Sequence, residues 1–162
     1  MPLIQAEPMH FLIPLLFWIP PTDSSWTWPV QGTHIVLNKF DKPAQNWLPG
    51  HRGVDLDALL GRVVVSAGDG NVVFAGLIAG KGVITVSHGE LHTTYEPVLP
   101  LVAVGTKVKK GQRIGFVAPG VSHCSPGIEP FCLHWGLKRG TEYLDPLLLL
   151  RPHARLLPQF KN

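Results

Sequence analysis

Short apolar runs alternate with turn residues along most of the chain. The runs are rich in valine, isoleucine, threonine and aromatic residues, as β-strands are. Glycine, proline, asparagine or aspartate lies between most of them, which indicates tight turns. The runs are Arg62–Ala67, Asn71–Ala75, Val83–His88, Leu91–Glu96, Val102–Val108, Arg113–Val117 and Cys132–Lys138. Strands at this spacing predict an antiparallel sandwich or barrel, and Asp145–Leu150 has room for one helical turn.

Glycine and proline are too frequent for an ordinary helix. The chain holds 17 glycines and 16 prolines in 162 residues, and the longest stretch free of both is Thr33–Lys42. A mean α-helix has about 11–12 residues, so an average helix would contain a breaker. Helical bundles, coiled coils and doubly wound α/β folds are therefore excluded. The prediction is an all-β domain with an antiparallel sheet core and little or no helix.

The length predicts a single domain between two segments of different composition. Residues 1–25 are a leader or linker, residues 26–150 the domain, and residues 151–162 a basic, proline-broken tail. The apolar run Phe11–Ile19 has the length of a signal-peptide core, although no lysine or arginine precedes it and Pro14 interrupts it. We expect an atypical signal and an extracellular or cell-envelope location. The alternative is an apolar arm that packs on the domain.

Charge and hydropathy exclude two classes of partner. The chain has 14 basic and 11 acidic residues, a net charge of +3. No lysine or arginine run is longer than two, so a nucleic-acid partner is not expected. No apolar run reaches the ~20 residues of a membrane-spanning helix, so stable membrane insertion is not expected either. The weak positive charge favours an anionic polymer such as a cell envelope.

Three residues from separate segments could hold one metal ion. His51 and Asp55 are spaced as H-x-x-x-D, and in a straight strand they would lie ~13 Å apart. The chain must therefore bend at Gly50 and Gly53, with His51 in a loop and Asp55 on the next strand. Such a pair alone is more often an ordinary surface feature. With His134 it forms a three-ligand set with an open fourth position, as catalytic zinc is held.

The two cysteines, Cys124 and Cys132, lie in or beside one loop rich in proline and glycine. In an oxidising compartment a disulfide between them would close this loop; in a cytosol they would be thiols or metal ligands. On a strand Cys132 shares a face with His134. A reduced Cys132 could therefore become a fourth zinc ligand, which would make the site structural.

An ordered set of motifs resembles the M23 peptidases, the lysostaphin- and LytM-like zinc endopeptidases that cut peptidoglycan cross-links. The motifs, in family order, are Trp28-Pro29-Val30, Phe40, His51-Arg52-Gly53-Val54-Asp55-Leu56, Ala67-Gly68-Asp69-Gly70-Asn71-Val72, Ser87-His88-Gly89, Thr93-Thr94-Tyr95, Val104-Gly105, Lys110-Gly111-Gln112, Ile114-Gly115, Leu133-His134-Trp135-Gly136-Leu137 and Tyr143-Leu144-Asp145-Pro146. The resemblance implies an antiparallel core related to the duplicated hybrid motif of barrel-sandwich hybrids. It also implies a Zn²⁺ on His51, Asp55 and His134. The expected function is hydrolysis of peptidoglycan peptides by a monomeric zinc endopeptidase using a metal-bound water.

The sequence departs from the family pattern at two histidines. Pro97 stands where the family has a catalytic histidine in a Tyr-x-His-Leu motif, and Cys132 replaces the first histidine of a His-x-His motif. Losing such groups typically lowers the rate ~10²–10⁴-fold each. Both replacements, with the paired cysteines, resemble an actinobacterial subgroup of the family. The alternative function is therefore a degenerate domain that binds the cell wall or regulates a partner hydrolase.

Two residues could substitute for the missing histidines. His123 lies beside Cys124, and a Cys124–Cys132 disulfide would tether it near the strand of His134. Glu96 is next to the lost histidine position, and a carboxylate beside zinc can act as a general base. Strand alternation predicts that Glu96 points away from the side to which the family histidine points.

A third class of function is a biotin or lipoate carrier, which the Val-x-Val-Gly pattern near Val102–Val108 also suits. Such a carrier needs a modifiable lysine in a tight hairpin. Lys81 lies between glycines but lacks the usual flanking residues. The sequence therefore favours the zinc peptidase and its degenerate variant.

Overall fold

The structure is a computed structural model that describes residues 25–32, 34–119 and 131–151. This part of the chain contains β-strands and one short 3₁₀-helix, η1 (Pro146–Leu150). The all-β prediction is confirmed, and so is the helical turn after Asp145. In the described ranges, none of the helical structure has the length and hydrophobicity that a membrane crossing needs.

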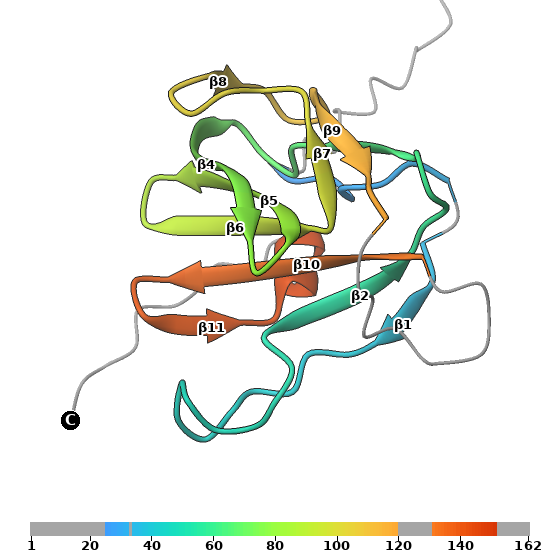
Figure 1. The fold of residues 1–162 in the computed structure, drawn as a ribbon. Helices are drawn as coiled ribbons and strands as arrows, with labels where there is room; N and C mark the ends of the chain where they lie inside the picture. Colours follow the sequence, from blue (N-terminus) through green and yellow to red (C-terminus); the bar gives the residue numbers. More distant parts are fainter. Residues whose placement is uncertain (1–24, 33, 120–130, 152–162) are drawn as a thin grey trace, which may run out of the picture.

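The larger sheet contains the strand that carries His134. Its strands, in spatial order, are β1 (Val36–Asn38), β2 (Gly53–Asp57), β10 (Cys132–Arg139), β6 (Leu91–Glu96), β5 (Lys81–His88), β4 (Gly70–Ile78) and β8 (Lys107–Val108), with β11 (Glu142–Leu144) paired to β10. Every pairing is antiparallel. Figure 1 shows β10 crossing the middle of the molecule, between β2 and β6.

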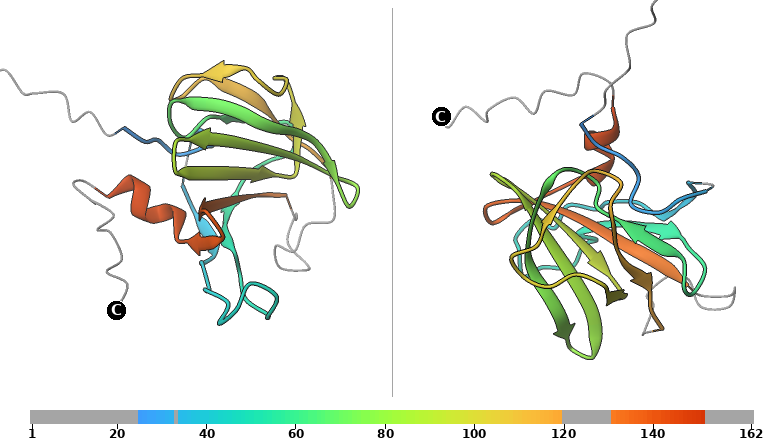
Figure 2. Two further views of the ribbon diagram at one scale, coloured as in Figure 1. Left: turned by 90° about the vertical axis from the view of Figure 1, so that its left-hand side faces the viewer. Right: turned by 90° about the horizontal axis from the view of Figure 1, so that it is seen from above.

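A smaller sheet covers one face of the larger one. It consists of β3 (Val63–Val65), β9 (Arg113–Val117) and β7 (Val98–Pro100), again antiparallel. The hydrophobic core draws buried side chains from both sheets. Its members include Val54, Leu56, Val64, Ile84, Tyr95, Val98, Ile114, Val117, Leu133, Trp135 and Leu137. Figure 2 shows the same arrangement from two further sides. On β10, Leu133, Trp135 and Leu137 belong to the core, so the alternate positions of this strand lie on the opposite face.

The predicted strands agree with the structure where a run is bounded by clear turns. β6 and β9 have the predicted limits, and β4 extends further than Asn71–Ala75. The strand predicted at Val102–Val108 is wrong for most of its length, because only Lys107–Val108 pairs with β4. Gly105 adopts a φ of +89°, which makes a turn in the middle of an apolar run.

The 3₁₀-helix η1 ends the described part of the chain with a defined cap. The Asp145 side chain accepts a hydrogen bond from the backbone N–H of Leu147 at 2.9 Å. Pro146 occupies the first turn, where its missing N–H is not needed. Leu149 is buried in the core, so η1 packs against β2 and β10.

Candidate metal centre

Strand register places one polar row across the larger sheet. Asp55 on β2 lies opposite His134 on β10, and His134 lies opposite Glu96 on β6. Residues paired across antiparallel strands point to the same face. The neighbours Leu133 and Trp135 point into the core, where both are fully buried. The alternation expected for this strand is therefore present, with the polar row on the outer face.

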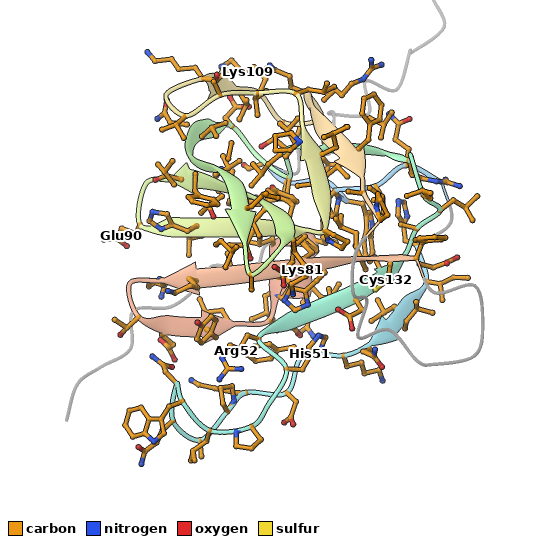
Figure 3. All side chains as sticks on the ribbon, in the orientation of Figure 1. His51, Arg52, Lys81, Glu90, Lys109 and Cys132 are labelled. Carbon is orange, nitrogen blue, oxygen red and sulfur yellow. The ribbon has the colours of Figure 1, made fainter. Side chains whose placement is uncertain are left out.

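His51 reaches this row from the loop before β2. Its backbone forms an isolated bridge with Asp41, with N···O distances of 2.8 and 3.0 Å. The Arg52 guanidinium donates to the backbone oxygens of Asn46 and Leu48 at 2.7 and 3.0 Å. These bonds fix the loop on both sides of His51, which Figure 3 labels next to Arg52.

The ligand atoms of three side chains converge on one point. His51 Nε2 lies 3.1 Å from Asp55 Oδ1 and 3.1 Å from His134 Nδ1, and His134 Nδ1 lies 2.8 Å from Asp55 Oδ1. These residues form a group that could hold a metal ion. The ligand atoms of a tetrahedral zinc, at ~2.0–2.1 Å from the ion, lie roughly 3.3 Å from one another. The observed triangle has nearly that size.

The outer contacts of the cluster turn its acceptor atoms inward. His51 Nδ1 lies 2.7 Å from the backbone oxygen of Lys39, and a carbonyl can only accept, so this nitrogen carries the proton. His51 Nε2 is then unprotonated, and its lone pair faces Asp55 and His134. Asn38 Nδ2 donates to Asp55 Oδ2 at 2.9 Å and leaves Oδ1 directed at the histidines. Hydrogen bonds of this kind orient metal ligands in proteins. The donor set therefore fits a zinc ion.

The close contacts around Gly53 explain why the H-x-x-x-D motif contains a glycine. A Cβ at this position would lie 2.3 Å from the backbone oxygen of Trp135 and 2.7 Å from His134 Nε2. Gly53 belongs to β2, so its role is to let β10 and the His134 ring approach closely, rather than to bend the chain as the sequence suggested. Gly50, whose Cβ would lie 2.8 Å from the backbone oxygen of Asp41, allows the tight bridge beside His51.

The expected direction of Glu96 is corrected by the register. Glu96 lies directly opposite His134 and so shares the face of the three ligand residues. The expectation failed because it counted strand alternation from Pro97, which lies beyond the end of β6. The Glu96 carboxylate forms an ion pair with Lys81 Nζ at 3.2 Å.

The remaining candidates differ in what the structure says of them. Cys132 is buried on β10, opposite Asp57, and is not among the residues that gather at the cluster. His123 and Cys124 lie outside the described residues, so the disulfide and the role of His123 stay predictions. Sequence reasoning missed Asn38 and the carbonyl of Lys39, since neither belongs to a motif that signals a contact with the ligands.

A second histidine lies in a separate polar network. His88 contacts the backbone oxygen of Asp69 at 2.7 Å through Nδ1 and Thr93 Oγ1 at 2.8 Å through Nε2. Thr93 Oγ1 lies 2.7 Å from the Tyr95 hydroxyl, which accepts from the N–H of Ala67 at 2.9 Å. Burial lowers the pKa of His88 and raises that of Tyr95. Hollows of about 410 and 400 Å³ adjoin His88. The ring nitrogens of His88 are both engaged, so this network is less suited to bind a metal than the His51 cluster.

The sequence model of peptidase family M23 matches residues 49–146, which include all three residues of the candidate metal-binding group. The chain belongs to peptidase family M23. An uncharacterized protein of Mycobacterium tuberculosis is 44% identical over 134 residues, 80% of this chain and 53% of the relative. The lipoprotein NlpD/LppB homolog of Pseudomonas aeruginosa is 30% identical over 135 residues, 80% of this chain and 41% of the relative. The chain thus spans about half the length of these relatives.

The fold of this M23 domain also matches a solved peptidase. The catalytic domain of lysostaphin from Staphylococcus simulans aligns with a TM-score of 0.61 at 22% identity, over 73% of this chain and 93% of that domain. This likeness confirms the expected fold. Pro97 and Cys132, the residues predicted to replace two histidines of the family pattern, are both buried in this M23 domain.

Proposed function

We propose that the chain is a zinc-dependent endopeptidase domain that hydrolyses peptide cross-links of peptidoglycan. The observation that carries this proposal is the convergence of His51 Nε2, Asp55 Oδ1 and His134 Nδ1. Two of the ligand side chains reach solvent, with 20% of His51 and 12% of His134 exposed, whereas Asp55 is fully buried. A substrate can therefore approach from the outer face of β2 and β10.

Three protein ligands would leave the fourth position of a tetrahedral zinc ion for water or substrate. When bound, zinc acts as a Lewis acid that polarises a carbonyl and lowers the pKa of a coordinated water to about 7. The chain holds the ligands rigidly, because Asn38 and the carbonyl of Lys39 fix the orientations of Asp55 and His51. The zinc ligands thus need little rearrangement for the reaction.

Glu96 is our proposed proton acceptor. Its position opposite His134 puts the two Cβ atoms about 4.5–5.5 Å apart, on the face where a substrate would bind. As the water oxygen bonds to the peptide carbon, one water proton passes to the Glu96 carboxylate. The same proton then passes to the amine nitrogen as the C–N bond breaks. His123 is the alternative residue for this role, and the variants Glu96→Gln and His123→Ala distinguish the two.

The decisive experiment measures new amino termini released from purified peptidoglycan. We expect the wild type with zinc to release them and Asp55→Ala to release none. His92→Ala is the matched control, since His92 lies on β6 outside the ligand group. Equal release by the wild type and Asp55→Ala would contradict the proposal. Loss of activity in Glu96→Gln but not in His123→Ala would assign the proton transfer to Glu96.

A second candidate function is a degenerate domain that binds the wall or regulates a partner hydrolase. The observation that favours it is the burial of Pro97 and Cys132, because neither can exchange a proton with a substrate. This function predicts zinc binding and co-sedimentation with peptidoglycan without release of amino termini. Addition of the protein to a separate active hydrolase would then test for regulation.

We further propose that the protein works in the cell envelope or outside the cell. The P. aeruginosa relative is named as a lipoprotein, and the net charge of +3 favours contact with an anionic polymer. Fractionation of cells with an antibody to the chain, followed by mass spectrometry of the isolated protein, would test the location and the N-terminal processing together. Recovery in the cytosol alone would contradict it.

A further inference from the structure

Lys81 is held at a defined position by the β4–β5 hairpin. Ala79 and Gly80 form its turn, with φ angles of +50° and +80°, and Ile78 pairs with Lys81 across it. Positive φ angles at both turn residues match the right-handed twist of the flanking strands. The register matters, because a slip of one residue would turn Lys81 to the other face of the sheet.

Gly82 brings this end of β5 close to its neighbour. A Cβ at Gly82 would lie 1.9 Å from the backbone oxygen of Val98, so only glycine allows the approach. Val98 begins β7, two residues after Glu96. The close approach therefore holds Lys81 beside the end of β6, where its ammonium meets the Glu96 carboxylate at 3.2 Å. Figure 3 labels Lys81 in this region.

The ion pair is more sheltered than a typical surface pair. Only 26% of the Lys81 side chain and 23% of the Glu96 side chain are exposed. Fully exposed pairs contribute little, because water and salt screen them. Partial burial makes the contact between Lys81 and Glu96 a stronger constraint on where the carboxylate points.

Beside the cluster, the Glu96 carboxylate could also serve as a zinc ligand. A carboxylate is itself a zinc ligand, and a fourth protein ligand turns an open zinc site into a closed, structural one. Glu96 is one strand away from His134 and on the same face. The Lys81 ammonium contacts this carboxylate at 3.2 Å and so influences where it points.

We propose that Lys81 is a positioning residue that holds Glu96 away from the fourth coordination position and so keeps the zinc site open. This inference rests on the proposed function, but its first effect is on zinc binding. Without Lys81, Glu96 would turn toward the ligand group and close it. Zinc affinity would then increase while hydrolysis decreases, a combination that simple damage to the fold does not produce.

The test uses the complete chain with Lys81→Met, which keeps the apolar stem of the side chain. Calorimetric titration with zinc alone should show an affinity increase of about tenfold or more. On peptidoglycan, kcat should fall about 100-fold with little change in KM, as expected when a reacting group is misplaced. Lys81→Arg, which keeps the ion pair, should resemble the wild type in both measurements.

The double variant Lys81→Met/Glu96→Gln separates ligation from simple charge repulsion. If Glu96 becomes a ligand, the gain in zinc affinity disappears in the double variant. If the loss of the lysine charge alone raises affinity, the gain remains and the inference is wrong. Absorption spectra of the cobalt-substituted proteins provide a direct check, because a change in ligand number alters their intensity.

The outcomes also distinguish this inference from the proposed function. A wild type without hydrolytic activity, combined with a Glu96-dependent affinity gain in Lys81→Met, would overturn the proposed function and support the role of Lys81. An active wild type whose Lys81→Met variant keeps normal kcat and zinc affinity would overturn only the role of Lys81.

Discussion

Two histidine-containing clusters lie on the larger sheet, and they differ in how their hydrogen bonds close. One surrounds His88 at the ends of β5 and β6, and the other joins His51 and His134 beside Asp55. Both contain imidazole rings within hydrogen-bonding distance of oxygen atoms. The difference lies in where the outer hydrogen bonds of each cluster direct its acceptor atoms.

The His88 network has a single consistent direction. At one end the N–H of Ala67 can only donate, and at the other end the carbonyl of Asp69 can only accept. The Tyr95 hydroxyl therefore donates to Thr93, and the Thr93 hydroxyl donates to Nε2 of a neutral His88. Every member is satisfied without any added ion. Such a network stabilises a fold and leaves no site for a ligand.

The outer hydrogen bonds of the metal cluster are arranged differently. The protonated His51 Nδ1 donates to the backbone oxygen of Lys39, and Asn38 Nδ2 donates to Asp55 Oδ2. Two imidazole nitrogens and one carboxylate oxygen then face one another within 3.1 Å. A proton, such as one on His134 Nδ1, or a metal ion must lie among them. The comparison teaches that the direction of the outer hydrogen bonds, more than the number of histidines, distinguishes a candidate metal site from a closed network.

Of the substitutions that test this comparison, removal of a proposed ligand should have the largest effect, a loss of zinc binding. We expect the purified wild type to hold one zinc per chain and His134→Ala to lose more than about 100-fold in zinc affinity, beyond the usual loss for an outer hydrogen bond. Elemental analysis after dialysis measures the zinc content. His92→Ala, the control, should keep its zinc. Equal zinc content in His134→Ala and the wild type would contradict the assignment.

Removal of an outer hydrogen bond should have a smaller effect on the same cluster. Asn38→Ala removes the hydrogen bond to Asp55 Oδ2 and should lower zinc affinity about 10–100-fold, or about 1.4–2.7 kcal/mol. Titration with zinc measures the change. Asn71→Ala on β4 is the control, because the exposed Asn71 lies outside the cluster. An unchanged affinity in Asn38→Ala would show that the orientation of Asp55 does not depend on Asn38.

A substitution in the His88 network should lower the stability of the protein without changing metal binding. Thr93→Val keeps the shape of a fully buried side chain but removes the link between His88 and Tyr95. We expect a loss of about 1–2 kcal/mol in the free energy of unfolding, because buried polar groups lose a partner. Urea denaturation measures the loss, and zinc stoichiometry should not change. Thr94→Val, on the opposite face of β6, is the control; an equal loss there would argue against a special role of the network.

The sequence contained enough information to group the three ligand residues and to predict most of the sheet. His51, Asp55 and His134 could be grouped because their residue types match zinc chemistry and because alternation on β10 separates His134 from Leu133 and Trp135. The direction of Glu96 could not be predicted correctly, since it depends on where β6 ends. The register between strands that are distant in the sequence decides which polar residues meet.

The contacts that orient Asp55, His51 and Glu96 could not be predicted from the sequence for a related reason. Asn38 meets Asp55 through the irregular pairing of β1 with β2, which no local pattern specifies. Lys39 contributes only a backbone carbonyl, which any residue could provide. Lys81 reaches Glu96 because Gly82 permits a close approach to Val98. In each case the contact depends on tertiary geometry rather than on residue type.

The smallest expected effect concerns the protonation of His88. Its pKa is lowered from 6.5, first by burial and further by the nearby His92, while Asp69 acts in the opposite direction. The unfolded chain therefore binds this proton at higher pH than the folded chain does, and stability decreases as pH falls below about 6.5. Protonated His88 also could not accept from Thr93, so the directed network would lose one bond. NMR titration should give His88 a midpoint below 6.5, and urea denaturation of zinc-free protein should show a smaller acid destabilisation in His88→Asn than in the wild type. A His88 midpoint at or above 6.5 would mean that the network tolerates the charge, and the contrast between a closed and an open histidine cluster would no longer hold.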